Sequence, residues 1–528
     1  MKTLMASLLS MLLPSLAVAA EAPATLDSDG AWTAAGSPYQ VVGTTVVPVG
    51  VTLTIEPGAV IELAADAGLQ VQGQLIARGT EEAPILFVRS SGSSEQDRWG
   101  SVTFEPTSMP ASFEQIDQYA AGSILEWCVF EGASRAVQLL GASPYIHHCA
   151  FRDNRTPLSL DVEGGAALFI ADGAAPRIRD CLFENNLADG LNYGGAIYVD
   201  SSSPILQDNV LMGNTAIYGG GLCTTLVASP IVGNRFEGNI ATGSDDNSKG
   251  GGMSLISTIS AVLNNTVIGN KSGGDGGGIH VCVECHPHAT PFLLDNTVTG
   301  NEAETQDPSH AAGGIGAAFL RVMTSNNIHG NTRGGQPSEF GWFHPIEEGF
   351  PDWVANVSVA GNWWGTADGA TVDALVANGE PTAGAGSANP HPVLSGPVQE
   401  ATPRVTITTR RLRYDEAAQE MGVFLTLYNP GPAKSFELRI LLQYEGGLSV
   451  PYLAPLGLPE ETVDTGGHRF SMPQNSVWFA TLAMPSYDPL NRMGGGGAWN
   501  AALYDPESGA LVGIPCRARF QLLEEVMP

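Results

Sequence analysis

Basic residues are scarce in this chain. The 528 residues carry 54 acidic side chains against 24 lysines and arginines, which gives a formal net charge of −30. Such a surface repels polyanions, so the composition argues against nucleic acid and anionic lipid as partners. A negative surface suits a soluble extracellular protein, and it is also compatible with binding of calcium or of basic partners.

Long apolar runs are missing beyond the N-terminus. No later stretch holds the roughly 20 apolar residues that a membrane-spanning helix needs. Residues 1–20 have the order of a signal peptide, with Lys2, an apolar run and small residues before Glu21. We therefore predict export to the periplasm, the cell surface or the extracellular space. Because no cysteine follows the expected cleavage site, we expect peripheral membrane contact or none.

Helical periodicity is also missing, and a short pattern recurs instead at spacings of 21 to 32 residues. Its first position holds cysteine or asparagine, an apolar residue follows two positions later, and asparagine follows after five in every copy but the first, which has Ala133. The first positions are Cys128, Cys149, Cys181, Asn209, Asn234, Asn265, Asn296 and Asn326. The later asparagines are Asn154, Asn186, Asn214, Asn239, Asn270, Asn301 and Asn331.

Short β-branched segments bounded by glycine and asparagine read as strands, and a fixed repeat predicts a solenoid of stacked coils. Equivalent asparagines would then form a ladder of hydrogen bonds that satisfies turn backbone groups. Glycine pairs such as Gly194–Gly195 and Gly250–Gly251 would allow turns that a Cβ would block. Cys128, Cys149 and Cys181 are expected inside the coil, with a disulfide between rungs as the alternative.

This repeat resembles the right-handed parallel β-helix of the pectin-lyase-like superfamily. The segment Gly194–Ile197, together with Phe-x-x-Asn at Phe151, Phe183 and Phe236, is similar to repeats of the polymorphic outer-membrane protein family. The resemblance spans about residues 30 to 395. Since no C-terminal membrane barrel is evident, the secretion route of those relatives does not transfer.

The domain prediction is a signal peptide at 1–20, a β-helix at 21–395 and a β-sandwich of Ig-like type at 400–528. Beyond the Gly/Ala/Ser/Pro segment 382–397 the asparagine repeat ends, and longer strand patterns follow, such as 422–428 and 436–444. The predicted fold class is all-β throughout.

Aromatic residues crowd the end of the repeat. Trp342, Trp353, Trp363 and Trp364 either close the coil or offer rings on which sugars stack. We therefore consider these four residues as candidate ligand-binding positions.

The segment Cys282-Val283-Glu284-Cys285-His286 matches the attachment signature of c-type haem. Alternatively, Cys282, Cys285, His286 and His288 are suitable ligands for zinc or copper, or the thiols form a local disulfide. Thr225 and Ile256 occupy the position of Cys282 in neighbouring repeats, which favours an ordinary strand there.

An enzyme of this superfamily would be a polysaccharide lyase or glycosidase. A lyase needs calcium held by acids and a base beside the uronate; the candidate acids are Asp200, Asp245, Asp246 and Asp275, and the candidate bases are Arg177, Arg179, Arg235 and Lys249. These residues form no convincing motif, and phosphate-loop, nucleophile-elbow and zinc-hydrolase motifs are missing. The favoured prediction is a non-catalytic protein acting in adhesion or binding of polysaccharide; a carbohydrate-active enzyme and a haem or metal protein are the alternatives.

Overall fold

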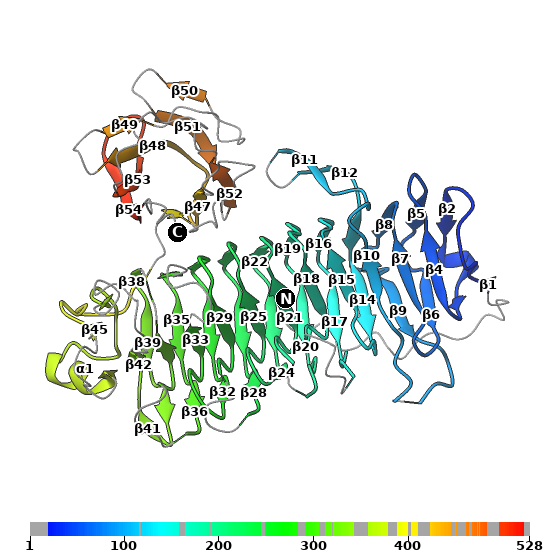
Figure 1. Ribbon diagram of the computed structural model, residues 1–528, viewed down its shortest axis with the longest axis horizontal. Helices are drawn as coiled ribbons and strands as arrows, with labels where there is room; N and C mark the ends of the chain where they lie inside the picture. The colour runs from blue at the N-terminus through cyan, green and yellow to red at the C-terminus, as the bar shows by residue number, and fades with distance from the viewer. Residues whose placement is uncertain are drawn as a thin grey trace, which may run out of the picture.

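The computed structural model describes residues 20–94, 96–115, 118–157, 164–190, 192–243, 249–282, 291–305, 312–318, 320, 322–342, 357–378, 388–399, 403–409, 423–444, 449–451, 461–463, 467–472, 474, 476–482 and 496–521. An elongated coil of short strands carries a second β domain on one side (Figure 1). Three long sheets, which we call A, B and C, run along the coil, and all of their strand pairs are parallel. In the described part of the chain, no helix is long and apolar enough to cross a membrane.

Sheet A contains the strands that carry the repeat's apolar column. They are β1 (Ala20–Glu21), β3 (Tyr39–Val41), β6 (Val60–Leu63), β9 (Ile85–Arg89), β14 (Cys128–Glu131), β17 (Ala150–Arg152), β20 (Leu182–Glu184), β23 (Val210–Met212), β27 (Arg235–Glu237), β31 (Thr266–Ile268), β35 (Thr297–Thr299) and β39 (Asn327–His329).

Sheet B includes the strands that follow the glycine pairs. They are β4 (Thr44–Val47), β7 (Gly68–Val71), β10 (Val102–Phe104), β15 (Val137–Leu140), β18 (Leu168–Ala171), β21 (Ile197–Asp200), β25 (Leu222–Thr225), β29 (Met253–Ile256), β33 (Ile279–Cys282), β37 (Ile315–Ala317), β42 (Phe340–Trp342) and β44 (Val376–Asn378).

Sheet C lies between B and A along each coil. Its strands are β2 (Gly30–Trp32), β5 (Thr52–Ile55), β8 (Gln74–Arg78), β13 (Ile124–Glu126), β16 (Tyr145–His147), β19 (Arg177–Arg179), β22 (Ile205–Gln207), β26 (Pro230–Val232), β30 (Ala261–Leu263), β34 (Phe292–Leu294) and β38 (Val322–Thr324).

The coil also carries a short side sheet, a hairpin and several smaller elements near its two ends. A short side sheet contains β24 (Thr215–Ala216), β28 (Ile240–Ala241), β32 (Lys271–Ser272), β36 (Glu302–Ala303), β40 (Thr332–Arg333) and β41 (Gln336–Pro337). A hairpin of β11 (Ser112–Gln115) and β12 (Gln118–Ala121) projects from it, η1 (Ala34–Gly36) lies near its start, and β43 (Val357–Ser358), α1 (Gly369–Leu375) and β45 (Ala388–Asn389) lie near its end.

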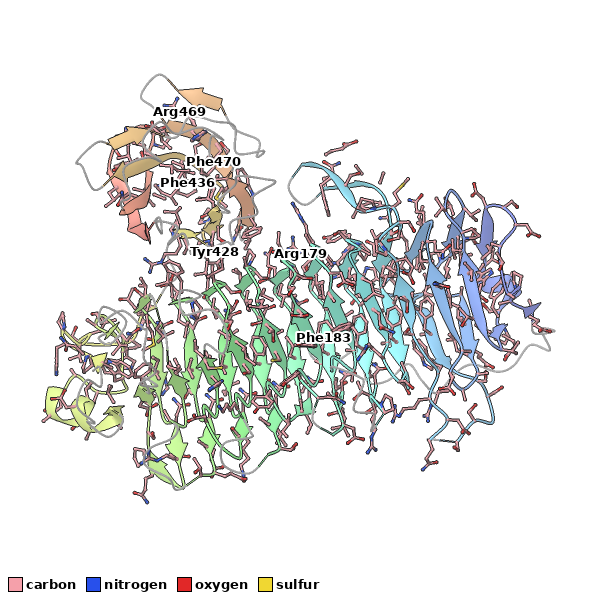
Figure 2. The ribbon with its side chains drawn as sticks, viewed as in Figure 1. Arg179, Phe183, Tyr428, Phe436, Arg469 and Phe470 are labelled. Carbon is pink, nitrogen blue, oxygen red and sulfur yellow. The ribbon has the colours of Figure 1, made fainter. Side chains whose placement is uncertain are left out.

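The coil interior is filled by stacked columns of side chains. Phe87, Phe130, Phe151 and Phe183 stack with successive ring centroids 4.7, 4.9 and 4.8 Å apart, as the spacing of parallel strands requires. Figure 2 shows Phe183 within the coil. Cys128, Cys149 and Cys181 are free and buried, so the three thiols occupy the interior and form no disulfide.

Asparagines form two hydrogen-bonded ladders. After the first member of each ladder, each side chain accepts, at its Oδ1, bonds from the backbone N–H and the Nδ2 of the asparagine one rung earlier, and its own Nδ2 donates to a strand carbonyl. The first ladder runs through Asn154, Asn186, Asn214, Asn239, Asn270, Asn301 and Asn331. The second runs through Asn209, Asn234, Asn265, Asn296, Asn326 and Asn362.

Glycine is required at several of the turns into sheet B. Gly219 has φ +62°, and a Cβ there would lie 2.0 Å from the Leu222 carbonyl oxygen. Gly250, one rung on, has φ +73° and the same conflict with the Met253 carbonyl. No L side chain fits these positions without moving the backbone.

The C-terminal β domain consists of two antiparallel sheets. One contains β46 (Arg404–Thr409), β47 (Val423–Asn429) and β52 (Ser476–Leu482). The other contains β48 (Lys434–Tyr444), β49 (Ser449–Pro451), β50 (Glu461–Val463), β51 (Gly467–Met472), β53 (Gly496–Tyr504) and β54 (Leu511–Gln521).

This domain packs directly on the outer face of sheet C. One apolar cluster joins its core to outward side chains of the coil, which are Val232, Ala261, Leu263, Phe292 and Leu294. Arg404 donates two bonds to the buried carboxylate of Asp295, at 2.6 and 2.7 Å, and Asn264 Nδ2 donates to the Tyr428 hydroxyl at 2.7 Å. The coil face therefore completes the core of the C-terminal domain.

Candidate functional site

Sheet B presents one column of outward side chains that changes in character from rung to rung. In the registered strands β18, β21, β25, β29 and β33, the aligned outward residues are Phe169, Tyr198, Cys223, Ser254 and His280. Their strand neighbours, such as Ile170 and Val199, point into the coil and are fully buried. The face is therefore aromatic at two rungs and polar at the following ones.

A second column runs beside the first at the turn into sheet B. Backbone bridges connect Gly164 to Tyr193, Tyr193 to Tyr218, Tyr218 to Lys249, and Lys249 to Asp275. Each of these residues precedes a glycine that starts the turn. The tight glycine turn thus fixes the position of each of these residues beside the strand column.

The two columns meet in an aromatic cluster, which we call the tyrosine cluster and which comprises Phe169, Tyr193, Tyr198 and Tyr218. The centroid distance is 5.5 Å between Tyr193 and Tyr198, 5.1 Å between Tyr193 and Tyr218, and 5.7 Å between Phe169 and Tyr198. The Arg135 guanidinium lies 4.6 Å from the centroid of Phe169. Only Tyr198 is buried, and the other three rings are partly exposed.

The polar end of the face surrounds a buried histidine. His280 Nδ1 lies 3.3 Å from the Ser254 hydroxyl, and both side chains are almost fully buried. Burial, followed by the charge of Lys249, holds the pKa of His280 well below its usual range, so the ring is neutral. Lys249 is half-buried, and Asp275 is 8% exposed. A cation and a carboxylate thus lie on adjacent rungs beside the tyrosine cluster.

The candidates for lyase chemistry are divided among three faces. Lys249 and Asp275 lie in the turn column, and Asp200 ends β21 on the same side of the coil. Arg177 and Arg179 instead flank the interior Ile178 on sheet C. Arg235 is on sheet A, where it forms an ion pair with Glu237 at 2.6 Å. Asp245 and Asp246 lie outside the described residues.

The Cys-x-x-Cys-His segment is described only at its first residue. Cys282 ends β33, partly buried, and it is in register with Ile256 and, one rung further, Thr225, as the repeat alignment predicted. Cys285, His286 and His288 lie outside the described residues. Within the described ranges, no group of three or more metal-ligating side chains comes together. Haem, metal or disulfide at this segment therefore stays a prediction.

Of the four tryptophans at the end of the coil, Trp363 and Trp364 have side chains among the described residues. Trp364 is 1% exposed and packs edge-on to Phe340, with centroids 6.4 Å apart, so this ring lies in the interior at the end of the coil. A ligand-binding role of the tryptophans stays a prediction. Trp363 is partly exposed and pairs through its backbone with Asn327. Trp342 ends β42, and Trp353 lies outside the described residues.

The tyrosine cluster was missed at the sequence level although a signal was present. Tyr193 and Tyr218 both stand directly before glycine pairs, at one fixed position of the repeat. The same position holds Lys249 one repeat later. Comparison of that position across the repeats would have identified the turn column.

Comparison with known proteins identifies the coil. Residues 116–256 match the family described as a right handed beta helix region. No curated protein and no solved structure matches the chain. The narrower likeness to repeats of polymorphic outer-membrane proteins stays a prediction. The three long parallel sheets and this match show that the coil is a right-handed parallel β-helix, which fits the pectin-lyase-like superfamily.

Proposed function

We propose that this is an exported, non-catalytic β-helix protein that binds glycans through the tyrosine cluster and acts in adhesion. The observation that carries the proposal is the grouping of four aromatic rings, three of them partly exposed, on the outer face of sheet B. Aromatic rings give large contact areas at small entropic cost, and their polar tips accept and donate hydrogen bonds. Both properties match the alternating apolar faces and hydroxyls of sugars.

Export is supported by the order of residues 1–20, and a location at the cell surface or in the extracellular space agrees with an adhesive role. The coil holds the rings at fixed spacings on a rigid scaffold, so little ordering is needed on binding. A repeating polymer such as a cell-surface polysaccharide would meet successive rungs with successive units.

The test is binding of the mature protein to a panel of immobilised glycans, with a Tyr193→Ala/Tyr218→Ala variant. Loss of two stacking rings is expected to weaken binding by roughly tenfold. Tyr504→Ala is the matched control, because Arg439 covers that ring at 4.4 Å much as Arg135 covers Phe169. Equal binding by the wild type and the double variant would contradict the proposal.

A second candidate, a carbohydrate-active enzyme, is favoured by Lys249 and Asp275 on adjacent rungs beside the rings. With calcium present, an ultraviolet assay for unsaturated uronate products would detect lyase action. Lys249→Ala should then abolish activity, while Arg235→Ala on sheet A should leave it unchanged. Absence of product across uronate polysaccharides would reject lyase chemistry and leave the binding proposal in place.

A further inference from the structure

The outer face of sheet A lies away from the parts that cover sheet C. The hairpin β11–β12 and the C-terminal domain project from one side of the coil, and the strands β17 and β20 of sheet A lie on the other (Figure 1). Two columns of outward side chains run along sheet A, because alternate residues of each strand point away from the interior. Apart from Ala150, which is 6% exposed, the outward side chains from β6 to β35 are partly exposed.

The first column is apolar over six consecutive strands, from β6 to β23. Its registered residues are Val60, Leu86, Val129, Ala150, Leu182 and Val210, which we call the aliphatic stripe. At about 4.8 Å per strand, the stripe is roughly 24 Å long. Beyond it the column becomes polar, with Arg235 and Thr266. A contiguous apolar stripe on an open face is typical of an interaction surface.

The second column has an acidic residue on every second strand. From β1 to β31 it reads Glu21, Gln40, Glu62, Val88, Glu131, Arg152, Glu184, Met212, Glu237 and Ile268. Each glutamate is therefore followed by a residue that is not acidic. This spacing lowers repulsion within one chain, and it also makes the column complementary to a reversed copy of itself.

We infer that sheet A is the interface of a dimer of this chain, in which two coils pack face to face and antiparallel. The two-fold axis runs parallel to the strands and passes between β14 and β17. This position is the midpoint of the aliphatic stripe, so each apolar residue of the stripe faces another one. Leu86 faces Leu182 of the partner subunit, and Val129 faces Ala150 of the partner subunit.

The same axis also pairs the charges. Glu131 faces Arg152 of the partner subunit, and symmetry repeats this pair. Every other glutamate of the column faces a residue that is not acidic. An axis on β17 would instead place Glu131 against Glu184 of the partner subunit. Repulsion therefore excludes an axis on a strand, and the aliphatic stripe selects the position between β14 and β17.

Both members of the proposed ion pair can form a further contact. Within the described ranges, no hydrogen bond or ion pair involves the Glu131 carboxylate. Arg152 Nε lies 3.3 Å from a carboxylate oxygen of Glu184, and this buried donor has no hydrogen bond among the described residues. A guanidinium has five N–H donors, so Arg152 can bind a second carboxylate.

The available area predicts a weak dimer. With this axis ten strands of each subunit overlap, over about 43 Å, and three residues of a strand span about 10 Å. The projected face is thus roughly 430 Å² per subunit, close to the lower limit of about 1,000 Å² in total for a specific interface. The strands β35 and β39 lie outside the overlap, and Asn327 of β39 already exchanges two hydrogen bonds with Val398.

The test is sedimentation velocity of the mature full chain over a range of protein concentrations, without glycan. Leu86→Lys places a charge in the aliphatic stripe, and Arg152→Glu places an acid against Glu131 of the partner subunit. Both are expected to weaken the dimer at least tenfold, because each change acts twice in a symmetric dimer. Thr297→Lys is the matched control, since Thr297 continues the first column on β35, outside the overlap. It should associate as the wild type does.

A charge exchange tests the position of the axis. Glu131→Arg combined with Arg152→Glu recreates the pair in reverse and should restore the dimer that Arg152→Glu loses. Failure of this rescue in a variant with wild-type thermal unfolding would overturn the proposed axis. A wild type that stays monomeric at all concentrations, or a dimer that Leu86→Lys and Arg152→Glu leave intact, would overturn the interface.

The dimer does not depend on the proposed glycan binding, because association is measured without a ligand. Loss of glycan binding in the Tyr193→Ala/Tyr218→Ala variant should leave the dimer unchanged. Conversely, Leu86→Lys should keep the tyrosine cluster intact but lose one of its two copies per particle. If both proposals hold, the dimer carries two tyrosine clusters and binds a polymer with higher apparent affinity than the monomer does.

Discussion

Single asparagines are expected to have large effects on stability in this protein, because each ladder side chain forms hydrogen bonds with neighbouring rungs. Asn234 accepts from the backbone N–H and from the Nδ2 of Asn209, and its own Nδ2 donates to the Leu206 carbonyl. All of these groups are buried, where an unmet hydrogen bond is costly. The second ladder is therefore a structural feature that a single substitution can interrupt.

Asn234→Ala is expected to lower the free energy of unfolding by about 2 to 3 kcal/mol, because buried donors on Asn209 lose their acceptor. Urea unfolding followed by circular dichroism measures the change.

Cys181→Asn is the complementary variant. Cys181 Sγ lies 3.8 Å from the Ile146 carbonyl, and its N–H already donates to Asn209, so asparagine would extend the ladder. A loss in Cys181→Asn as large as that in Asn234→Ala would contradict this account.

His147 is expected to make stability dependent on pH. Burial, with smaller effects from His148 and two arginines, lowers its pKa from 6.5 to about 3. The neutral ring can donate to Glu126, whose Oε1 lies 3.2 Å from Nε2. At a pH between the two pKa values, the unfolded chain binds a proton at His147 that the folded chain does not. Stability therefore falls as the pH decreases from 6.5 towards 3.

His147 is expected to change the free energy of unfolding by at most about 1.4 kcal/mol per pH unit, and His147→Gln should remove this dependence. Unfolding measured at pH 7, 5.5 and 4.5 for both proteins provides the comparison. Parallel pH profiles for the wild type and the variant would exclude His147 as the source of the dependence.

At the scale of elements, the first asparagine ladder ends on a buried acid. Asn331 Nδ2 donates to Glu339 Oε2 at 2.5 Å, and Glu339 is 3% exposed. Burial raises the pKa of this carboxyl above its usual range, although the bonds from Asn331 oppose the shift. A carboxylate thus takes the place that the next asparagine would occupy.

Glu339→Gln is expected to stabilise the protein at neutral pH and to leave it little changed near pH 4.5. The folded state holds the proton more tightly, so wild-type stability falls as pH rises above 4.5 through the raised pKa. Glutamine keeps an acceptor for Asn331 and removes the buried charge. Thermal unfolding at pH 4.5 and 7.5 tests this, and a lower melting temperature of the variant at pH 7.5 would refute it.

Strands and turns followed from the sequence wherever local rules applied. The spacing of asparagine and apolar residues indicated the rungs of 128–331, because the strand spacing forces identical positions to stack. The outward side chains of the same strands were harder to interpret. Pro230–Val232, Ala261–Leu263 and Phe292–Leu294 are apolar at every position, which is typical of strands buried on both faces, and this signal was overlooked.

At the scale of the whole molecule, the contact between the coil and the C-terminal domain is the main feature. The Arg404–Asp295 pair is 4% and 1% exposed, and it lies beside an apolar cluster shared by both parts. Burial raises the pKa of Asp295, and the guanidinium of Arg404 opposes this shift. We expect the pair to favour one orientation of the domain, because separating the partners would leave a buried charge uncompensated.

Arg404→Ala should loosen the domain, since the Asp295 carboxylate would stay buried without its cation, at a cost of about 3 to 5 kcal/mol. Hydrogen exchange of β30 and β34 is expected to increase, because their outer faces would be exposed more often. The control is Arg439→Ala, a substitution of a partly exposed arginine that is paired with Glu437 at 2.8 Å within the C-terminal domain. Unchanged protection of β30 and β34 in Arg404→Ala would show that the apolar contacts alone hold the domain.

The sequence by itself determined the coil, because its repeat, glycine turns and asparagine columns depend on interactions between neighbouring rungs at fixed register. Only the tertiary structure decided which outward side chains meet. Tyr193 and Tyr198 come from a turn and a strand, Arg177 meets Phe113 of a distant hairpin, and Asp295 meets Arg404 of another domain. Such contacts depend on the lengths of loops and on how separate units pack, and neither leaves a periodic signal in the chain.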